Sequence, residues 1–173
     1  MLSIEKCAVP VDTLLHEYFT KGAYADCYRN EIPQPVSFPE FIFAFYTTPL
    51  FKLERFILAR TVSKPSTDTQ ARQLANCEID TFAAWQVENQ RENEILMCDY
   101  RGRTRSWLSV VSAGDGGTRL YFGSAVVPRR NSKNGRSSLG FVFQMLLGFH
   151  RIYSVLLLYS AKRKLVHSAF GNS

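Results

Sequence analysis

The segment from residue 139 to residue 164 constrains the fold most, because it is long and strongly apolar. The pattern predicts one long C-terminal helix. A membrane span is the alternative, since residues 139–159 are numerous enough to cross a bilayer. Arg151 near the middle makes insertion costly, and Gln144 and His150 add polarity there. We therefore expect this helix to pack against the rest of the chain.

Before that helix, apolar residues recur with a period of two, which is typical of β-strands. The short links between the strands predict antiparallel pairing. The glycine-rich link at 114–117 indicates a tight hairpin, in which Trp107 would face Ser124. The expected strands cover residues 79–88, 94–101, 103–113 and 118–128.

The N-terminal half combines one strand with helices. Ser37 and Glu40 have the spacing of a capping box, which begins a helix, and Pro49 is suited to the first turn of the next one. The region 61–78 is polar, and we expect a loop with one weak helical turn there. We expect a strand at 24–32 and helices at 11–19, 38–47 and 49–60.

Together these elements predict a single α+β domain over residues 1–173, in which residues 1–21 form a peripheral segment. The sheet is expected to be curved and antiparallel, with about five or more strands. Two short helices follow the first strand, and the long C-terminal helix packs on the sheet. Hydrophobic residues make up 46% of the chain, which is enough for a substantial core.

The four cysteines give no sign of a metal site. They form no C-x-x-C pair, and no histidine has zinc-ligand spacing from them. We expect neither a metal nor a cofactor. The first residues lack the order of a signal peptide, so reduced thiols in a cytoplasmic protein are the simplest interpretation.

Charge is unevenly distributed along the chain. Residues 1–100 have a net charge of −5, whereas residues 101–173 have a net charge of +11. Such a split suggests a basic face for an acidic lipid surface or another anionic partner. The simpler interpretation is that the two halves neutralise each other. The basic clusters at 129–136 and 162–164 would also lie about 35 Å apart on a straight helix. Nucleic acid is disfavoured, because no recognisable nucleic-acid module occurs.

The element order resembles the helix-grip proteins, which include START-like lipid-transfer domains and aromatic-polyketide cyclases. The local sequence is similar to an uncharacterised bacterial family, a domain of unknown function sometimes fused to short-chain-dehydrogenase-like domains. The similarity implies a helix-grip fold from about residue 22 to 165 but no established activity. Four stretches carry it: 25–29 ahead of Pro33, 38–60, 107–110 and 149–151.

In a helix-grip arrangement, the concave face of the sheet and the last helix enclose a cavity. Large side chains on the strands and polar side chains of the helix are the candidates to line it. A filled core is the alternative, since aromatic residues at strand spacing are ordinary core material. The candidate ligand-binding residues are Trp85, Met97, Trp107, Tyr121, His150 and Arg151.

Three functions follow from these patterns. The first is binding of a small apolar or amphipathic molecule between the sheet and the last helix. The second is an enzyme with cyclase- or hydrolase-like chemistry, with His150 or Asp99 as the acid–base residue. In the structural alternative, His150 makes one hydrogen bond in the core and Arg151 pairs with an acid such as Asp99. The third is a basic-faced peripheral-membrane or interaction protein.

Overall fold

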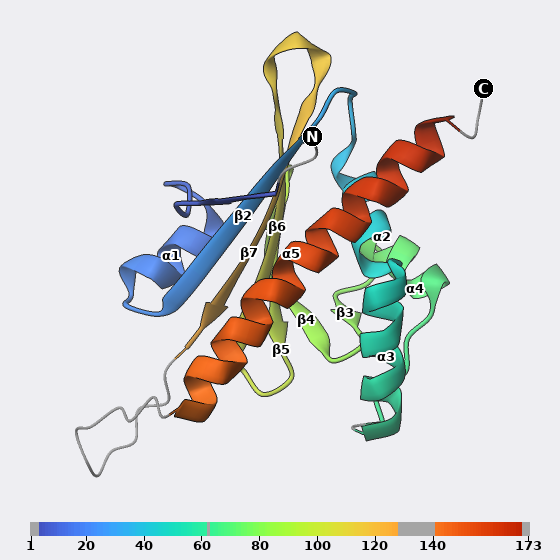
Figure 1. Cartoon of the computed structure of the whole chain (residues 1–173). Coiled ribbons are helices and arrows are strands. Elements are labelled where there is room, and N and C mark those ends of the chain that lie inside the picture. The colour runs from blue at the N-terminus through green and yellow to red at the C-terminus, as the bar shows by residue number, and fades with distance from the viewer. Residues whose placement is uncertain (1–3, 62, 128–140, 171–173) are drawn as a thin grey trace.

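The computed structural model describes residues 4–61, 63–127 and 141–170, without the side chains of Asp115 and of residues 141–150 and 168–170. Its described part contains a seven-stranded antiparallel sheet in the order β1-β2-β7-β6-β5-β4-β3 (Figure 1). The strands are β1 (Glu5–Cys7), β2 (Tyr24–Ile32), β3 (Thr81–Phe82), β4 (Trp85–Arg91), β5 (Glu94–Asp99), β6 (Thr104–Ser112) and β7 (Thr118–Val126). The helices are α1 (Leu14–Thr20), α2 (Phe38–Tyr46), α3 (Pro49–Thr61), α4 (Asp68–Ala75) and α5 (Phe141–Phe170), with a 3-10 turn η1 (Gly114–Gly116).

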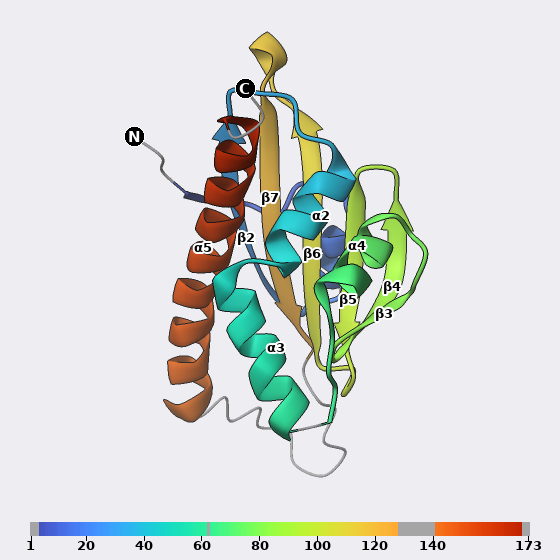
Figure 2. The ribbon, with the colours of Figure 1, turned by 90° about the vertical axis from the view of Figure 1, so that its right-hand side faces the viewer.

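Helices cover both faces of the sheet. Helices α2, α3, α4 and α5 lie on one face, here called the inner face, and α5 crosses it diagonally (Figures 1 and 2). Helix α1 covers the opposite, outer face (Figure 1). Side chains alternate along each strand. In β2, for example, Tyr28 belongs to the core on the inner face and Cys27 to the core on the outer face.

The inner core is aromatic where α2 and α3 meet the sheet. The ring of Phe45 lies 4.9 Å from that of Phe122, and the ring of Tyr46 lies 4.9 Å from that of Phe51. Offset and edge contacts of this kind add to the gain from apolar burial. Among the described side chains of α5, four apolar ones are buried in this core: Leu157, Leu158, Ala161 and Leu165.

The outer core is held together by one buried carboxylate. Glu94 Oε2 accepts hydrogen bonds from Trp107 Nε1 over 2.7 Å and from the backbone amide of Leu14 over 3.0 Å. The second bond satisfies an amide in the first turn of α1. Gly123 leaves the room that this packing needs, because an added Cβ would lie 2.4 Å from Leu15 Cδ2 and 3.1 Å from Trp107 Cε3.

The predicted α+β class, the antiparallel sheet and the long C-terminal helix are confirmed. The capping box of α2 forms as expected, with Ser37 and Glu40 each accepting the other's backbone amide. The expected start of the last helix, residues 139–140, lies outside the described residues. In the described part of the chain, no helix combines the length and the apolarity that a bilayer crossing requires.

Several details differ from the sequence prediction. The two helices follow the second strand rather than the first, because the short strand β1 precedes them, and a third helix, α4, comes next. The region predicted as one strand at 79–88 is divided at Ala83, whose φ of 52° interrupts an extended chain. Helix α4 has a capping box of Thr67 and Gln70, a signal that was present in the sequence.

The hairpin register also differs by one residue. The link between β6 and β7 runs from residue 113 to residue 117 and contains the turn η1, so that Trp107 pairs with Gly123 rather than with Ser124. Ser124 instead pairs with Ser106. A one-residue shift exchanges the two faces of a strand. It is therefore Ser106 that shares a face with Ser124, and Trp107 lies on the other side of the sheet.

Candidate ligand site on the inner face of the sheet

Three buried polar side chains lie side by side across the inner face of the sheet. Asp26 of β2 pairs with Ser124 of β7, and Ser124 pairs with Ser106 of β6. The Ser124 hydroxyl donates a hydrogen bond to Asp26 Oδ1 over 2.6 Å. Burial of these groups carries a desolvation cost unless each polar atom finds a partner.

Two polar atoms in this region lack a hydrogen-bond partner among the described residues, namely Asp26 Oδ2 and Tyr46 Oη. Tyr46 is only 1% exposed. Burial raises the pKa of its hydroxyl, and the neighbouring side chain of Ser106 opposes that shift without forming a hydrogen bond of normal geometry. Since buried polar groups are nearly always paired, these two atoms mark a place for a water molecule or for the polar atom of a ligand.

Helices α3 and α5 add an acid and a second tyrosine. The Tyr153 hydroxyl donates a hydrogen bond to Glu54 Oε2. Burial raises the pKa of Glu54, although hydrogen bonding with Tyr153 and Trp85 lowers it in part. The charge of Glu54 in turn raises the pKa of Tyr46, so the acid acts electrostatically on the row across the sheet. We call these six residues the inner polar cluster: Asp26, Tyr46, Glu54, Ser106, Ser124 and Tyr153.

Sequence reasoning missed this cluster, although two signals were available. Glu54 lies three residues after Phe51 and four before Leu58, so it shares a helix face with two residues of the inner core. Asp26 lies two residues before Tyr28, so both side chains point to the core-facing side of the strand. A charged residue on an apolar stripe or face is the pattern that indicates such a site.

The structure divides the four predicted strand residues between two faces. Trp85 packs against the inner core. Met97, which is fully buried there, pairs with Ser106, so an apolar side chain follows the three polar ones across the sheet. Trp107 and Tyr121 lie instead on the outer face, with ring centroids 6.0 Å apart, in the core beneath α1. These two residues therefore do not share a cavity with the first two.

The two predicted polar residues of the last helix have different outcomes. The side chain of His150 lies outside the described residues. Arg151 is exposed and donates hydrogen bonds from Nε and Nη2 to the hydroxyl of Tyr24, over 3.1 and 3.0 Å. It does not pair with Asp99. Nearby, burial and the charge of Asp26 raise the pKa of Tyr28 to about 12.

Asp99, the other acid–base candidate, stabilises a turn. Its Oδ1 accepts hydrogen bonds from the backbone amides of Arg103 and Thr104, over 2.6 and 2.8 Å. Its Oδ2 accepts one from the amide of Arg101 over 3.3 Å. The carboxylate thus holds the connection between β5 and β6, which is the usual role of an aspartate in a turn.

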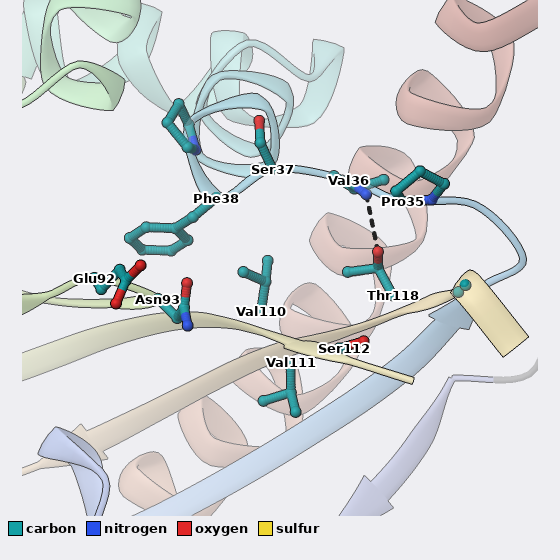
Figure 3. A pocket seen from close by; sticks show the side chains of 13 residues that line it. Pro35, Val36, Ser37, Phe38, Glu92, Asn93, Val110, Val111, Ser112 and Thr118 are labelled. Atoms are coloured by element: carbon teal, nitrogen blue, oxygen red, sulfur yellow. Dashed lines mark hydrogen bonds between the residues drawn. The ribbon is translucent and has the colours of Figure 1, made fainter. Parts of the chain in front are cut away.

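A surface groove of about 680 Å³ lies between the start of α2 and the tips of β5, β6 and β7 (Figure 3). Phe38 and Val110 point toward one another across it, whereas Val111 points to the far side of the strand. Thr118 Oγ1 accepts a hydrogen bond from the amide of Val36 over 2.9 Å, so this polar group ties the loop to β7. Glu92 is the one charged residue among the described residues that line it.

A second pocket, of about 460 Å³, has a basic lining that includes Arg163, Lys164 and His167 of α5. The ammonium of Lys164 donates a hydrogen bond to the backbone oxygen of Thr47 over 3.2 Å. Lys162, by contrast, is buried and donates a hydrogen bond to the backbone oxygen of Glu31 over 2.8 Å. The predicted basic cluster at 162–164 therefore does not form one face, and the one at 129–136 lies outside the described residues. Within the described ranges, no three potential metal ligands come together.

Comparison with known proteins adds little to these observations. No known family matches the chain, and no curated protein matches it. Among solved structures, the chain is similar to CalU16 from Micromonospora echinospora, at 13% sequence identity and a TM-score of 0.33. The similarity covers 100% of this chain and 98% of that chain.

Proposed function

We propose that the protein binds a small apolar or amphipathic molecule between the inner face of the sheet and the helices α2, α3 and α5. The observation that carries the proposal is the pair of unpartnered buried atoms, Tyr46 Oη and Asp26 Oδ2, on one face of the sheet. A ligand with a hydrogen-bonding group can satisfy either atom. The aromatic side chains around them favour an apolar body.

The chemistry of the inner polar cluster narrows the class of ligand. Tyr46 can donate or accept a hydrogen bond, and an ionised Asp26 can only accept. A negative charge on the ligand is disfavoured near the carboxyl groups of Glu54 and Asp26. We therefore expect a neutral molecule with a hydroxyl or amide group, or a cation with an apolar body.

The proposal is tested with two probes that differ by one hydroxyl, namely 2-naphthol and naphthalene. The dissociation constants of both are measured by calorimetry or competition for the wild type, Tyr46→Phe and Tyr100→Phe. Tyr100 is exposed, so its variant is the matched control. We expect 2-naphthol to bind the wild type better than naphthalene does by about threefold to tenfold, which is the effect of one hydrogen bond.

In Tyr46→Phe the preference for 2-naphthol should disappear, while Tyr100→Phe should keep it. Binding of neither probe to the wild type would contradict the proposal, as would an equal preference in all three proteins. Tyr46→Phe should not unfold more easily than the wild type, because it removes a buried hydroxyl that has no partner among the described residues. Lost binding is then separable from lost folding.

A second candidate function is acid–base catalysis on the same scaffold, with Glu54 in place of His150 or Asp99. The observation that favours it is the raised pKa of Glu54, caused by burial beside Tyr153 and Trp85. A carboxyl group shifted upward can hold a proton nearer to neutral pH, as a general acid requires. Hydrolysis of p-nitrophenyl acetate by the wild type and Glu54→Gln tests it: a tenfold or larger loss in the variant supports catalysis, and equal rates exclude this role.

A further inference from the structure

Two cysteines that are twenty positions apart in sequence are direct partners across the edge of the sheet. Cys7 of β1 pairs with Cys27 of β2, and their sulfur atoms lie 3.3 Å apart. Both thiols are free in this structure. Directly opposed residues of antiparallel strands point to the same side, so no change of strand order is needed to bring the sulfurs together.

The backbone geometry already fits a disulfide bond. Opposed residues in an antiparallel pair have Cα atoms about 4.5 or 5.5 Å apart. Disulfides join residues whose Cα atoms are about 4.4 to 6.8 Å apart, with an S–S bond of about 2.05 Å. Shortening the present 3.3 Å contact to a bond requires only small rotations of the two side chains.

The surroundings give the two thiols different roles. Cys7 is partly exposed, whereas Cys27 is buried in the outer core beneath α1. Hydrogen bonding with Cys27 lowers the pKa of Cys7, and the positive charge of Arg29 acts in the same direction. The same contact and burial raise the pKa of Cys27, which therefore keeps its proton. Cys7 is accordingly the more reactive sulfur, because the thiolate is the reactive form.

We propose that Cys7 and Cys27 are a site of reversible oxidation, at which a peroxide converts the two thiols into an intramolecular disulfide. The Cys7 sulfur attacks one oxygen of hydrogen peroxide, which yields a sulfenic acid at Cys7 and one water. The Cys27 sulfur then attacks the Cys7 sulfur and releases a second water. Two thiols lose two electrons and two protons in total, and the peroxide is reduced to two waters.

The disulfide would fasten β1 to the rest of the sheet. β1 is an edge strand of three residues, and three pairs with β2 define its register. A covalent link at the Cys7 end should protect these backbone amides from hydrogen exchange. The oxidised protein should also unfold at a higher temperature than the reduced protein.

The experiment treats the reduced full chain with a stoichiometric amount of hydrogen peroxide and analyses it by intact mass and by peptide mapping without reductant. Loss of two hydrogen atoms, a peptide that joins Cys7 to Cys27 and full reversal by dithiothreitol are expected. The double variant Cys77→Ser/Cys98→Ser is the matched control and should form the same bond. Cys7→Ser should not form it, nor should Cys27→Ala.

Cys27→Ala removes a buried side chain of the outer core, whereas Cys7→Ser changes a partly exposed residue. The Cys7→Ser variant therefore keeps the test valid if Cys27→Ala fails to fold. A disulfide that involves Cys77 or Cys98 in the wild type would overturn the proposal. So would stable sulfinic acid at Cys7 with a free thiol at Cys27, or oxidation that proceeds only between two chains.

Discussion

At the scale of single residues, the inner polar cluster contains polar atoms whose burial is not matched by protein partners. Asp26 and Tyr46 each keep an unpartnered oxygen among the described residues, whereas Glu94, on the outer face, has its carboxylate fully engaged. The difference separates a group that stabilises the fold from groups that are available to a ligand.

A pH prediction follows from Glu54. Burial raises the pKa of this carboxyl in the folded protein. Between the ordinary glutamate pKa and that raised value, the folded state holds the extra proton, so the free energy of unfolding falls as pH rises through this window. Glu54→Gln removes this loss. The free energy of unfolding of the variant, relative to that of the wild type, should therefore be higher at pH 7 than at pH 4.

Urea unfolding of both proteins at the two pH values measures this difference. Glu92→Gln changes an exposed glutamate and serves as the control for the removal of one carboxylate. A relative stability of Glu54→Gln that is the same at pH 4 and pH 7 would contradict a raised pKa.

Gly123 yields a packing prediction at the same scale. A Cβ at this position would lie 2.4 Å from Leu15 and 3.0 Å from the backbone oxygen of Asp26. Gly123→Ala should lower the free energy of unfolding by about 1 to 3 kcal/mol, as overpacking does. Gly114 has no atom within 4 Å of an added Cβ, so Gly114→Ala should change it by less than about 0.5 kcal/mol. Equal effects in chemical denaturation would refute this account of the outer core.

At the scale of elements, short polar signals determined the helix boundaries. The Ser37 hydroxyl accepts the amide of Glu40, and the Glu40 carboxylate accepts the amide of Ser37 over 2.8 Å. These signals lie within four residues, which is why α2 could be predicted from sequence. The first helix shows the limit of such reasoning, because it was expected from residue 11, whereas its cap is Thr13 and Asp12 has a φ of 62°.

Loss of the Ser37 cap of α2 should have a measurable effect on stability. Ser37→Ala should lower the free energy of unfolding by about 1 kcal/mol, whereas Ser37→Gly should lower it by only a few tenths, since glycine is itself tolerated as an N-cap. Thermal and urea unfolding of the two variants provide the comparison. A loss that is as large for glycine as for alanine would show that the hydroxyl acts elsewhere than in the cap.

The candidate site was less predictable than the elements, for reasons of register. Trp107 and Met97 were both expected near a ligand, but a five-residue link in place of a two-residue one moves Trp107 to the outer face. Glycine-rich links admit several turn lengths, and each changes the face of every residue beyond. Lys162, read as part of a basic surface, instead reaches the sheet and is buried.

At the scale of the whole molecule, the fold depends on contacts between distant parts of the chain. β2 pairs along its entire length with β7, from Tyr24 with Val126 to Ile32 with Thr118. Local patterns identify both strands but cannot identify them as neighbours, because about a hundred residues separate them in sequence. Helix α5 then covers the inner face and completes the core.

The packing of α5 can be tested by comparing two leucines on the same helix. Leu158 is fully buried, whereas Leu156 is 46% exposed. Leu158→Ala should lower the free energy of unfolding by about 2 to 5 kcal/mol, because it removes apolar contacts and leaves a cavity. Leu156→Ala should lower it by less than about 1 kcal/mol. Similar losses for both variants would mean that α5 does not rest on the sheet in this orientation.

The inner polar cluster connects the sheet to the helices on its inner face, since its members come from β2, β6 and β7 and from α2, α3 and α5. Our central claim is that its unpartnered oxygens receive a polar group from a bound molecule. A crystal structure of the protein with 2-naphthol tests the claim most directly. We predict the naphthol oxygen within hydrogen-bond distance of Tyr46 Oη, with the ring between the sheet and α5. Both oxygens bonded to protein atoms alone, with the probe absent or on the surface, would contradict it.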